Sequence, residues 1–375
     1  MAERKSVQFN RREFSYFLSN TGKALRMPVF GYTFLYFMFV RILGLALLFC
    51  CLACFKTLAQ AEHVTTTRIA FGSCNDQRKA QPLWQEIIKT DPALWVWLGD
   101  NIYADTDSMP LMQQYYNLQL QHSGYKKLLQ TCPVTGIWSD HDYAGDNADK
   151  LFRKKQQSQQ LFLDFMGTGK NEAIRKQEGI YRTYTLGEGN KKVKLILLDG
   201  NYHRDPFRKL FRLYLPDESR DILGEAQWAW LEKELSNSDA SVHIIASGLQ
   251  VLPHSMAYTN WSAYPAARAR LLQLLEKTKP NIPLIISGDR HVGELSKYEL
   301  QGYTQPLYEI TSSGMTHFRE AKKGGNRYRV GEQVGALNFG LLQINWGKDT
   351  TTITMQVRGE KGSVYIAKTV EYTLN

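Results

Sequence analysis

Side chains able to bind metals recur in this 375-residue sequence directly after short apolar runs. Cys74 follows the run 68–72, Asp100 and Tyr103 follow 94–98, Asp140 and His141 follow 134–138, Asp199 follows 194–198, and Asp289 and His291 follow 283–287. The carboxyl ends of strands in open α/β sheets are where ligands bind. One acidic loop alone would be interpreted as a turn or a helix cap. Five apolar runs that all end in such residues predict a metal cluster.

The types of these side chains narrow the choice of metal. Carboxylates suit hard cations, whereas the thiolate of Cys74 and the phenolate of Tyr103 together suit Fe(III) or Zn better than Mg. Two neighbouring metals can share one carboxylate and hold both oxygens of an in-line phosphoryl displacement. Asp100 is the predicted bridging ligand, because Gly99 before it lets the backbone turn sharply.

Several of these residues also have a plainer interpretation. Cys74 could be a buried apolar thiol, or it could form a disulfide with Cys132, which we otherwise interpret as a packing residue. Tyr103 could be a core tyrosine. Asp105 could add a calcium ligand or simply be solvated. Three further histidines, His203, His254 and His317, are interpreted as structural residues or as residues that support a ligand, and not as ligands themselves.

Strands and helices alternate along the chain and are followed by a β-rich end. The apolar runs are interpreted as strands, and those without alternation as strands buried on both faces. Helices are expected over 109–130, 151–166, 224–235 and 265–279, and further strands over 308–311, 338–346, 351–357 and 365–373. This order predicts an α/β fold of stacked sheets flanked by helices.

The first 61 residues differ from the rest in composition. Residues 42–55 form an uncharged apolar core, and Ala59-Gln60-Ala61 has the small-x-small pattern of a signal peptidase site. We expect a leader over 1–61, cleaved after Ala61; a retained anchor is the alternative, because 28–55 contain a single charge. Met1, Met27 and Met38 all stay open as start codons. Either way the body is predicted to be exported: periplasmic, extracellular or anchored facing outside, with any membrane contact made through the leader.

The net charge of +10 is concentrated near the N-terminus. Residues 1–61 hold eight basic and two acidic residues, so the remainder carries only +4. That mild excess contains no basic run and indicates no nucleic-acid-binding module. No repeat or linker interrupts residues 62–375, which we interpret as one catalytic domain and a monomer.

Eight segments carry a resemblance to a known family. They are FGSCN (71–75), WLGDNIYAD (97–105), WSDHDYAGDN (138–147), LDGNYHRDP (199–206), LGEAQWAWLEKEL (223–235), SGLQVLP (247–253), SGDRHVGEL (287–295) and TSSGMTH (311–317). The sequence resembles the PhoD-like alkaline phosphatases and phosphodiesterases, relatives of the purple acid phosphatases in the calcineurin-like metallophosphoesterase superfamily. The resemblance implies a four-layer α+β sandwich, with two stacked mixed sheets between helices.

The resemblance also implies roles at matching positions. A ferric or iron-like metal would be held by Cys74, Asp100, Tyr103 and His291. Asp100 would bridge to a second site, commonly calcium, completed by Asp140 and Asp289. Zn, Mn or Mg are the alternatives to this Fe(III) and Ca(II) pair. Asn147 and Asp105 are further metal-site candidates. The implied catalytic residues are His141, as general acid, and Arg204, whose planar guanidinium would orient the phosphate.

Two departures from the family pattern bear on these roles. Ser139-Asp140 stands where the family usually has a double Asp, which removes an outer carboxylate. Gly200-Asn201 replaces a Thr-Arg pair, so Arg204 is expected to bind phosphate alone.

The predicted function is hydrolysis of phosphodiesters or phosphomonoesters by a metal-bound hydroxide. The alternative is a non-catalytic surface protein of the same fold that binds calcium or a phosphoglycan. The intact ligand set argues against this alternative, and the missing carboxylate at position 139 argues for it. The walls of the pocket come from the loops 105–125, 200–222 and 316–336, so the sequence does not specify which ester is cleaved.

Overall fold

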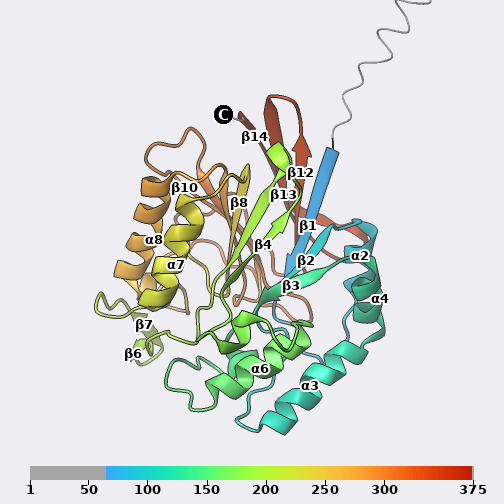
Figure 1. The fold of residues 1–375 in the computed structure, drawn as a ribbon, viewed down its shortest axis with the longest axis vertical. Helices are drawn as coiled ribbons and strands as arrows, with labels where there is room; N and C mark the ends of the chain where they lie inside the picture. Colours follow the sequence, from blue (N-terminus) through green and yellow to red (C-terminus); the bar gives the residue numbers. More distant parts are fainter. Residues whose placement is uncertain (1–64, 374–375) are drawn as a thin grey trace, which may run out of the picture. The chain divides into compact units, whose positions relative to one another are not determined.

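The structure, a computed structural model, describes residues 65–373; the predicted leader lies outside these residues. Two six-stranded sheets dominate this region (Figure 1). Sheet A has the order β14-β13-β12-β1-β2-β3: β1 (Thr65–Gly72), β2 (Leu94–Leu98), β3 (Val134–Ile137), β12 (Phe339–Trp346), β13 (Thr350–Arg358) and β14 (Val364–Thr373). Sheet B has the order β10-β11-β9-β8-β5-β4: β4 (Arg182–Leu186), β5 (Val193–Leu197), β8 (Val242–Ser247), β9 (Pro283–Ser287), β10 (Gly293–Tyr298) and β11 (Leu307–Ser312).

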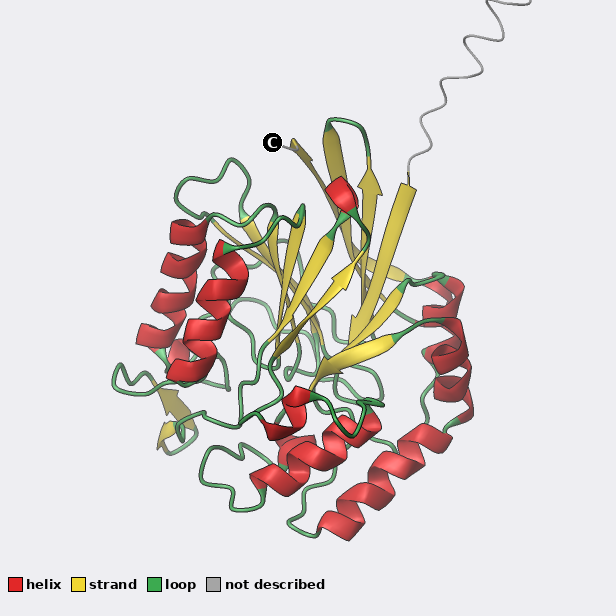
Figure 2. Ribbon diagram, in the orientation of Figure 1, coloured by secondary structure: helices red, strands yellow, loops and turns green. Residues whose placement is uncertain are grey.

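Helices flank the two sheets on their outer sides (Figure 2). The α-helices are α2 (Trp84–Lys89), α3 (Met109–Gln121), α4 (Ser123–Thr131), α5 (Asp140–Tyr143), α6 (Lys155–Phe165), α7 (Glu225–Ser236) and α8 (Pro265–Thr278). The 3₁₀ turns are Ala173–Lys176, Gly189–Lys191, Trp261–Ala263 and Glu360–Gly362. A short hairpin of β6 (Arg208–Leu210) and β7 (Leu213–Leu215) stands apart from both sheets.

The core lies between the sheets because successive side chains of a strand point to opposite faces. Leu195 and Leu197 of β5 join the core shared with sheet A, whereas Ile196 and Leu198 join a second core with α7 and α8. On sheet A, Trp97 packs edge-on against Trp84 of α2, with ring centroids 5.5 Å apart. The layers are therefore helices, sheet A, sheet B, helices. The predicted α/β four-layer sandwich is confirmed.

Most expected elements coincide with the observed ones, with one correction. The strands over 94–98, 242–247 and 283–287 have the predicted bounds. The single helix expected over 109–130 is wrong, because the chain breaks at His122, whose φ of −60° and ψ of 125° are extended. The His122 ring nitrogen accepts a hydrogen bond from the Gly124 backbone N–H and starts α4. Strands β4, β10, β6 and β7 are not predicted from the sequence.

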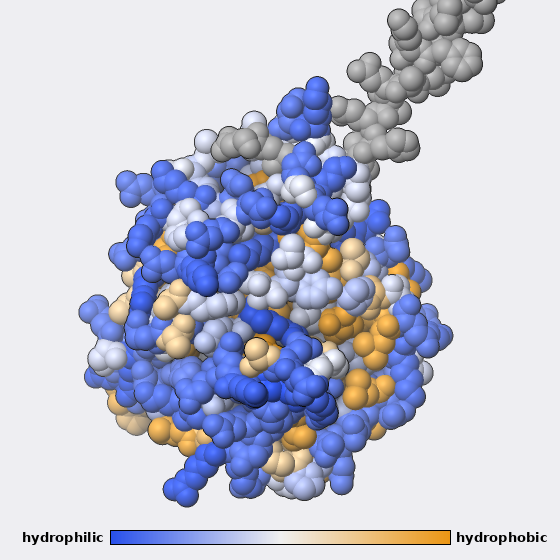
Figure 3. All heavy atoms as spheres, in the orientation of Figure 1, coloured by the Kyte–Doolittle hydropathy of each residue, from blue (hydrophilic) through white to orange (hydrophobic). Residues whose placement is uncertain are grey.

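The face of the molecule shown in Figure 3 is mainly hydrophilic, with hydrophobic atoms in small separate groups. Among residues 65–373, no helix is both long and apolar enough to cross a membrane.

Candidate metal centre

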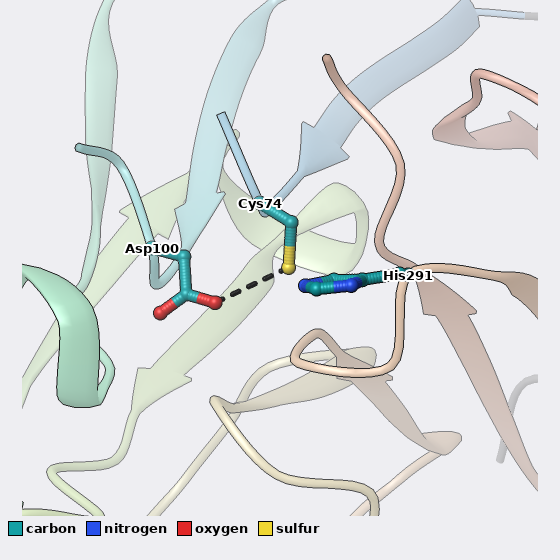
Figure 4. Close-up of side chains that lie close together, drawn as sticks. All are labelled: Cys74, Asp100 and His291. Carbon is teal, nitrogen blue, oxygen red and sulfur yellow. Dashed lines mark hydrogen bonds between the residues drawn. The ribbon is translucent and has the colours of Figure 1, made fainter. Parts of the chain in front are cut away.

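Three strand ends from both sheets bring ligand-type side chains together. Cys74 follows β1, Asp100 follows β2 and His291 follows β9, and their side chains point toward one another (Figure 4). The Cys74 Sγ lies 3.2 Å from Asp100 Oδ2. One ligand atom from each of the three residues lies within 4.8 Å of the others. This spacing suits a shared cation.

Asp100 also belongs to a second cluster. Its carboxylate, that of Asp140 and a ring nitrogen of His141 lie within 4.8 Å of one another. In the first cluster, the Tyr103 hydroxyl lies 3.4 Å from Asp100 Oδ2 and 3.1 Å from His291 Nε2. Asp100 is thus common to both groups, which is the position that a bridging carboxylate requires.

The backbone is strained at this centre. The left-handed region, with positive φ, is uncommon for residues other than glycine. Six residues here adopt it: Cys74 (61°), Asp100 (48°), Asp105 (45°), Asn147 (59°), Asp289 (69°) and His291 (57°). Gly99, at φ 91°, makes the sharp turn into Asp100, and a Cβ there would lie 2.5 Å from that of Ser139. Such strain concentrates at functional sites.

The electrostatics of the centre favour a bound cation. Burial, with the charges of Cys74 and Asp140, raises the pKa of Asp100 well above its usual range. Burial and the charge of Asp140 likewise raise the pKa of Asp289. The Oδ1 atom of Asp100 is buried and has no hydrogen-bond partner among the described residues. A metal ion would supply the missing partner and stabilise the clustered anions, so the residues present fit one.

His141 belongs to the second cluster, and its ring is held by a carboxylate. Its Nδ1 is 2.6 Å from Asp105 Oδ1. Burial alone would lower the pKa of His141, but the Asp105 hydrogen bond and the charges of Asp100 and Asp140 outweigh it and raise this pKa to about 10. Because Asp105 engages Nδ1, the other ring nitrogen is left to serve a ligand.

The structure adds His317 to the first cluster, although the sequence predicts a structural role for it. Its Nε2 lies 3.1 Å from the Tyr103 hydroxyl and 3.3 Å from His291 Nε2. Burial lowers the pKa of His317 to about 3, and that of His291 to about 4. Both rings are therefore neutral and can offer lone pairs. The position of His317 soon after a strand, in TSSGMTH, is the signal that could have identified it.

Two further residues hold the acidic loops in place. The Asp142 carboxylate accepts hydrogen bonds from the backbone N–H groups of Ser139 (2.7 Å) and Asp100 (3.2 Å). It therefore links the loop after β2 to the start of α5. The Ser139 hydroxyl donates to Asp140 Oδ1 at 3.2 Å. A hydroxyl thus orients Asp140 at the position where the family usually has a second Asp.

Arg204 differs from its predicted role as a phosphate ligand. It is 1% exposed, and its guanidinium donates to the backbone carbonyls of Asn147 and Ala148 and to the Tyr264 hydroxyl. The arrangement supports the loop whose Asn147 N–H donates to Asp140 Oδ2 at 2.5 Å. Three hydrogen bonds thus hold the Arg204 guanidinium behind the Asn147 loop, and Arg204 does not line the pocket next to Asp140.

Asp199 also lies away from the two clusters. Its carboxylate accepts hydrogen bonds from Trp138 Nε1 and from the backbone N–H groups of Ile180, Asn201 and Tyr202.

Cys74 and Cys132 are both free thiols, so the alternative disulfide is not formed.

The two clusters open into a pocket of about 120 Å³. Its lining includes Asp100, Asp140, His141, Asn147, Asp289 and His291, with Tyr214, Tyr258, Arg290 and Arg319 beside them. Arg290 stacks on Tyr258, with its guanidinium carbon 3.3 Å from the ring centroid. Arg290 and Arg319 line the pocket, whereas Arg204 does not. Arg290 lies between two predicted ligands in the sequence, whereas Arg319 has no such signal.

Two stacked mixed sheets with ligand-type side chains at their strand ends define a fold of the metallophosphoesterase class. The chain belongs to the PhoD-like phosphatase family, whose model matches residues 112–338. Alkaline phosphatase D of Bacillus subtilis (strain 168) is 24% identical over 305 residues, which are 69% of this chain and 50% of that protein. The chain thus spans about half the length of this curated relative.

Solved structures of other proteins resemble this chain. A structure of PhoD superposes with a TM-score of 0.67 at 16% identity, covering 83% of this chain and 70% of that one. A dimetal phosphatase from Danio rerio gives a TM-score of 0.48 at 11% identity, covering 82% of this chain and 99% of that one. The PhoD structure therefore has the same fold as this chain.

Proposed function

We propose that residues 62–375 form a catalytic domain that hydrolyses phosphodiesters or phosphomonoesters at the pocket, with two metal ions bound. The observation that carries this proposal is the position of Asp100, which belongs to both ligand clusters and keeps one buried oxygen without a partner among the described residues. Membership of the PhoD-like phosphatase family supports the same activity.

The ligand types in the two clusters suit two different metals. Cys74, Tyr103 and His291, with the neighbouring His317, offer sulfur, phenolate and imidazole ligands that suit Fe(III). Asp140, Asp289 and the amide of Asn147 offer oxygen ligands that suit Ca(II), with Asp100 serving both sites. Bound metal ions supply positive charge that polarises a phosphoryl oxygen and ionises water near neutral pH.

The pocket accommodates a phosphoryl group and leaves the rest of the ester outside. Its volume of about 120 Å³ corresponds to a few water molecules. Arg290 and Arg319 would bind the non-bridging oxygens, since guanidinium groups match phosphate geometry. His141, fixed through Nδ1 by Asp105, would donate a proton to the departing alkoxide.

We further propose that the leader 1–61 exports this domain, as a cleaved signal or as a retained anchor.

Metal removal tests the activity. Treatment with a chelator is expected to lower turnover of a bis-nitrophenyl phosphodiester by about 100-fold or more, because the clustered carboxylates cannot hold the phosphate without a cation. Added Ca²⁺ should restore turnover if the oxygen-rich site binds calcium. Circular dichroism before and after chelation verifies that the fold persists. Turnover unaffected by chelation would contradict the metal mechanism, and no turnover in the metal-loaded protein would favour the non-catalytic alternative.

The iron assignment has a separate optical test. A phenolate or thiolate bound to Fe(III) absorbs visible light, so the native protein is expected to be coloured. Tyr103→Phe should shift or abolish the band, because it removes the phenolate 3.4 Å from Asp100 Oδ2. Tyr214→Phe is the matched control: Tyr214 lines the same pocket, but its hydroxyl contacts Asn147. A colourless protein that is fully active with Zn alone would rule out iron and leave the fold unaffected.

A further inference from the structure

The β6–β7 hairpin carries an exposed cationic and apolar tip, residues 208–213, with the sequence RKLFRL. All six residues of this hairpin tip are exposed. Phe211 is 95% exposed, and Leu210 and Leu213 are 52% and 42% exposed. Single exposed apolar residues are ordinary on protein surfaces, but contiguous ones mark interaction sites. Figure 1 shows the hairpin at the lower left of the described region, outside both sheets.

The turn of the hairpin contains a residue that its backbone disfavours. Leu210 pairs with Leu213, so Phe211 and Arg212 form a two-residue turn. Phe211 has a φ of 54°, in the left-handed region where glycine is usual for such hairpins. A bulky aromatic side chain there costs conformational energy and gains no packing, since it is almost fully exposed. A residue that is unfavourable for its backbone conformation and makes no packing contacts is expected to be retained for a function such as binding.

The basic side chains of the hairpin tip form no direct ion pair with other described residues, although Asp217 lies near enough to Arg208 for their charges to interact. Arg208, Lys209 and Arg212 form no ion pair within residues 65–373. Residues 206–216 contain no acidic side chain. An exposed apolar tip surrounded by exposed cations is complementary to an anionic lipid surface, where aromatic and leucine side chains enter the interface and Lys and Arg contact the headgroups. A polyanion such as nucleic acid would use the cations but leave Leu210 and Leu213 in water.

The hairpin tip lies next to the pocket. Tyr214, which lines the pocket, is paired with Lys209 across the hairpin. The Tyr214 backbone N–H donates to the carbonyl of Met256, itself 42% exposed. A surface that binds the hairpin tip therefore comes close to the mouth of the pocket.

We propose that the hairpin tip docks the described domain on anionic lipid bilayers, with Phe211 entering the interface. This inference goes beyond phosphoester hydrolysis and does not require it. The hairpin would act in addition to any membrane contact of residues 1–61, which the variants below leave unchanged.

The test uses the full chain and vesicles of phosphatidylcholine with or without phosphatidylglycerol. Phe211→Gly is the decisive variant, because glycine suits a φ of 54° and preserves the turn. We expect it to lower vesicle partitioning at least about tenfold, and Arg208→Ala, Lys209→Ala and Arg212→Ala to lower it about fivefold each on the anionic vesicles. Val364→Ser, at a 46% exposed position on β14, is the matched control and should bind like the wild type.

A Phe211→Trp variant reports insertion at the hairpin itself. Its fluorescence should be quenched by brominated lipids in anionic vesicles more strongly than that of the wild type, whereas Val364→Trp should show no added quenching. Turnover of a soluble phosphodiester should be equal in Phe211→Gly and wild type, which separates docking from hydrolysis. Equal partitioning of wild type and Phe211→Gly, or no added quenching in Phe211→Trp, overturns the proposal. Loss of self-association in Phe211→Gly without loss of vesicle binding would instead assign the hairpin tip to a second copy of the chain.

Discussion

Asp100→Asn is expected to lower kcat/KM by on the order of 10⁴-fold, because it weakens both metal sites in one substitution. Asp100 is the carboxylate shared by the two clusters, and an amide carries no charge to bind either cation. The substitution should leave the backbone intact, since Asn tolerates the φ of 48° that Asp100 adopts. Metal analysis should show loss of both ions per chain.

The stability of the metal-free protein gives this prediction a second readout. Burial and neighbouring anions raise the pKa of Asp100, so the ionised carboxylate destabilises the metal-free fold. With folded pKa above unfolded pKa, this destabilisation grows as the pH rises. Asp100→Asn without metal should therefore unfold at a temperature equal to or higher than that of metal-free wild type. The difference should grow as the pH rises above the unfolded pKa of an aspartate and level off once the pH exceeds the raised folded pKa of Asp100.

Asp199→Asn is the matched control for Asp100→Asn, because both are strand-end aspartates that are 1% exposed. Asp199 accepts four hydrogen bonds from protein donors and lies away from the pocket. Its replacement should lower the free energy of unfolding by about 1–3 kcal/mol and leave metal content unchanged. The proposal fails if Asp100→Asn keeps its metals and its activity.

His141→Ala is expected to slow hydrolysis of alkyl phosphate esters by about 10²–10⁴-fold and nitrophenyl esters far less. An alkoxide needs a proton to depart, whereas nitrophenolate is already a stable anion. His141 lines the pocket, and Asp105 holds its Nδ1 at 2.6 Å, so the ring is fixed beside the substrate position. Metal content should stay at the wild-type value.

The opposing interpretation makes His141 a metal ligand, since its ring also lies within the second cluster. In that case both substrates should lose rate equally and bound metal should fall. Measuring the two rates and the metal content on one preparation decides between the roles. His254→Ala, at an exposed histidine outside the pocket, should change neither rate.

The sequence predicts the ligand types because strand ends have a local signature. Apolar runs such as 94–98 identify buried strands, and the polar residue that ends each run marks the sheet edge. Cys74, Asp100, Asp140, Asp289 and His291 follow this rule, and the structure brings them together. The helices on the outer layers are predictable for the same reason: apolar residues repeat at the helical period, as in α7 and α8.

The sequence cannot determine which strand ends share one space, because that depends on the order of strands within and between two sheets. Asp199 has the same local pattern as Asp100, yet its carboxylate accepts hydrogen bonds from Trp138 and neighbouring backbone groups. Arg204 looks available in the sequence, but folding buries its guanidinium against carbonyls near the Asn147 loop. The arginines that line the pocket are instead Arg290 and Arg319.

What the sequence determined alone is the chemistry of the centre: which side chains can bind metals, and that they end strands of an α/β sandwich. The tertiary structure determined which of these side chains lie together in each cluster. The strand order of sheet A places Cys74 and Asp140 beside Asp100, and the packing of sheet B on sheet A adds His291 and His317. The Phe211 turn belongs to a hairpin outside both sheets and is exposed. The reason is physical: ligand type is a property of each residue, whereas distances between residues far apart in the chain are set by how the sheets pack.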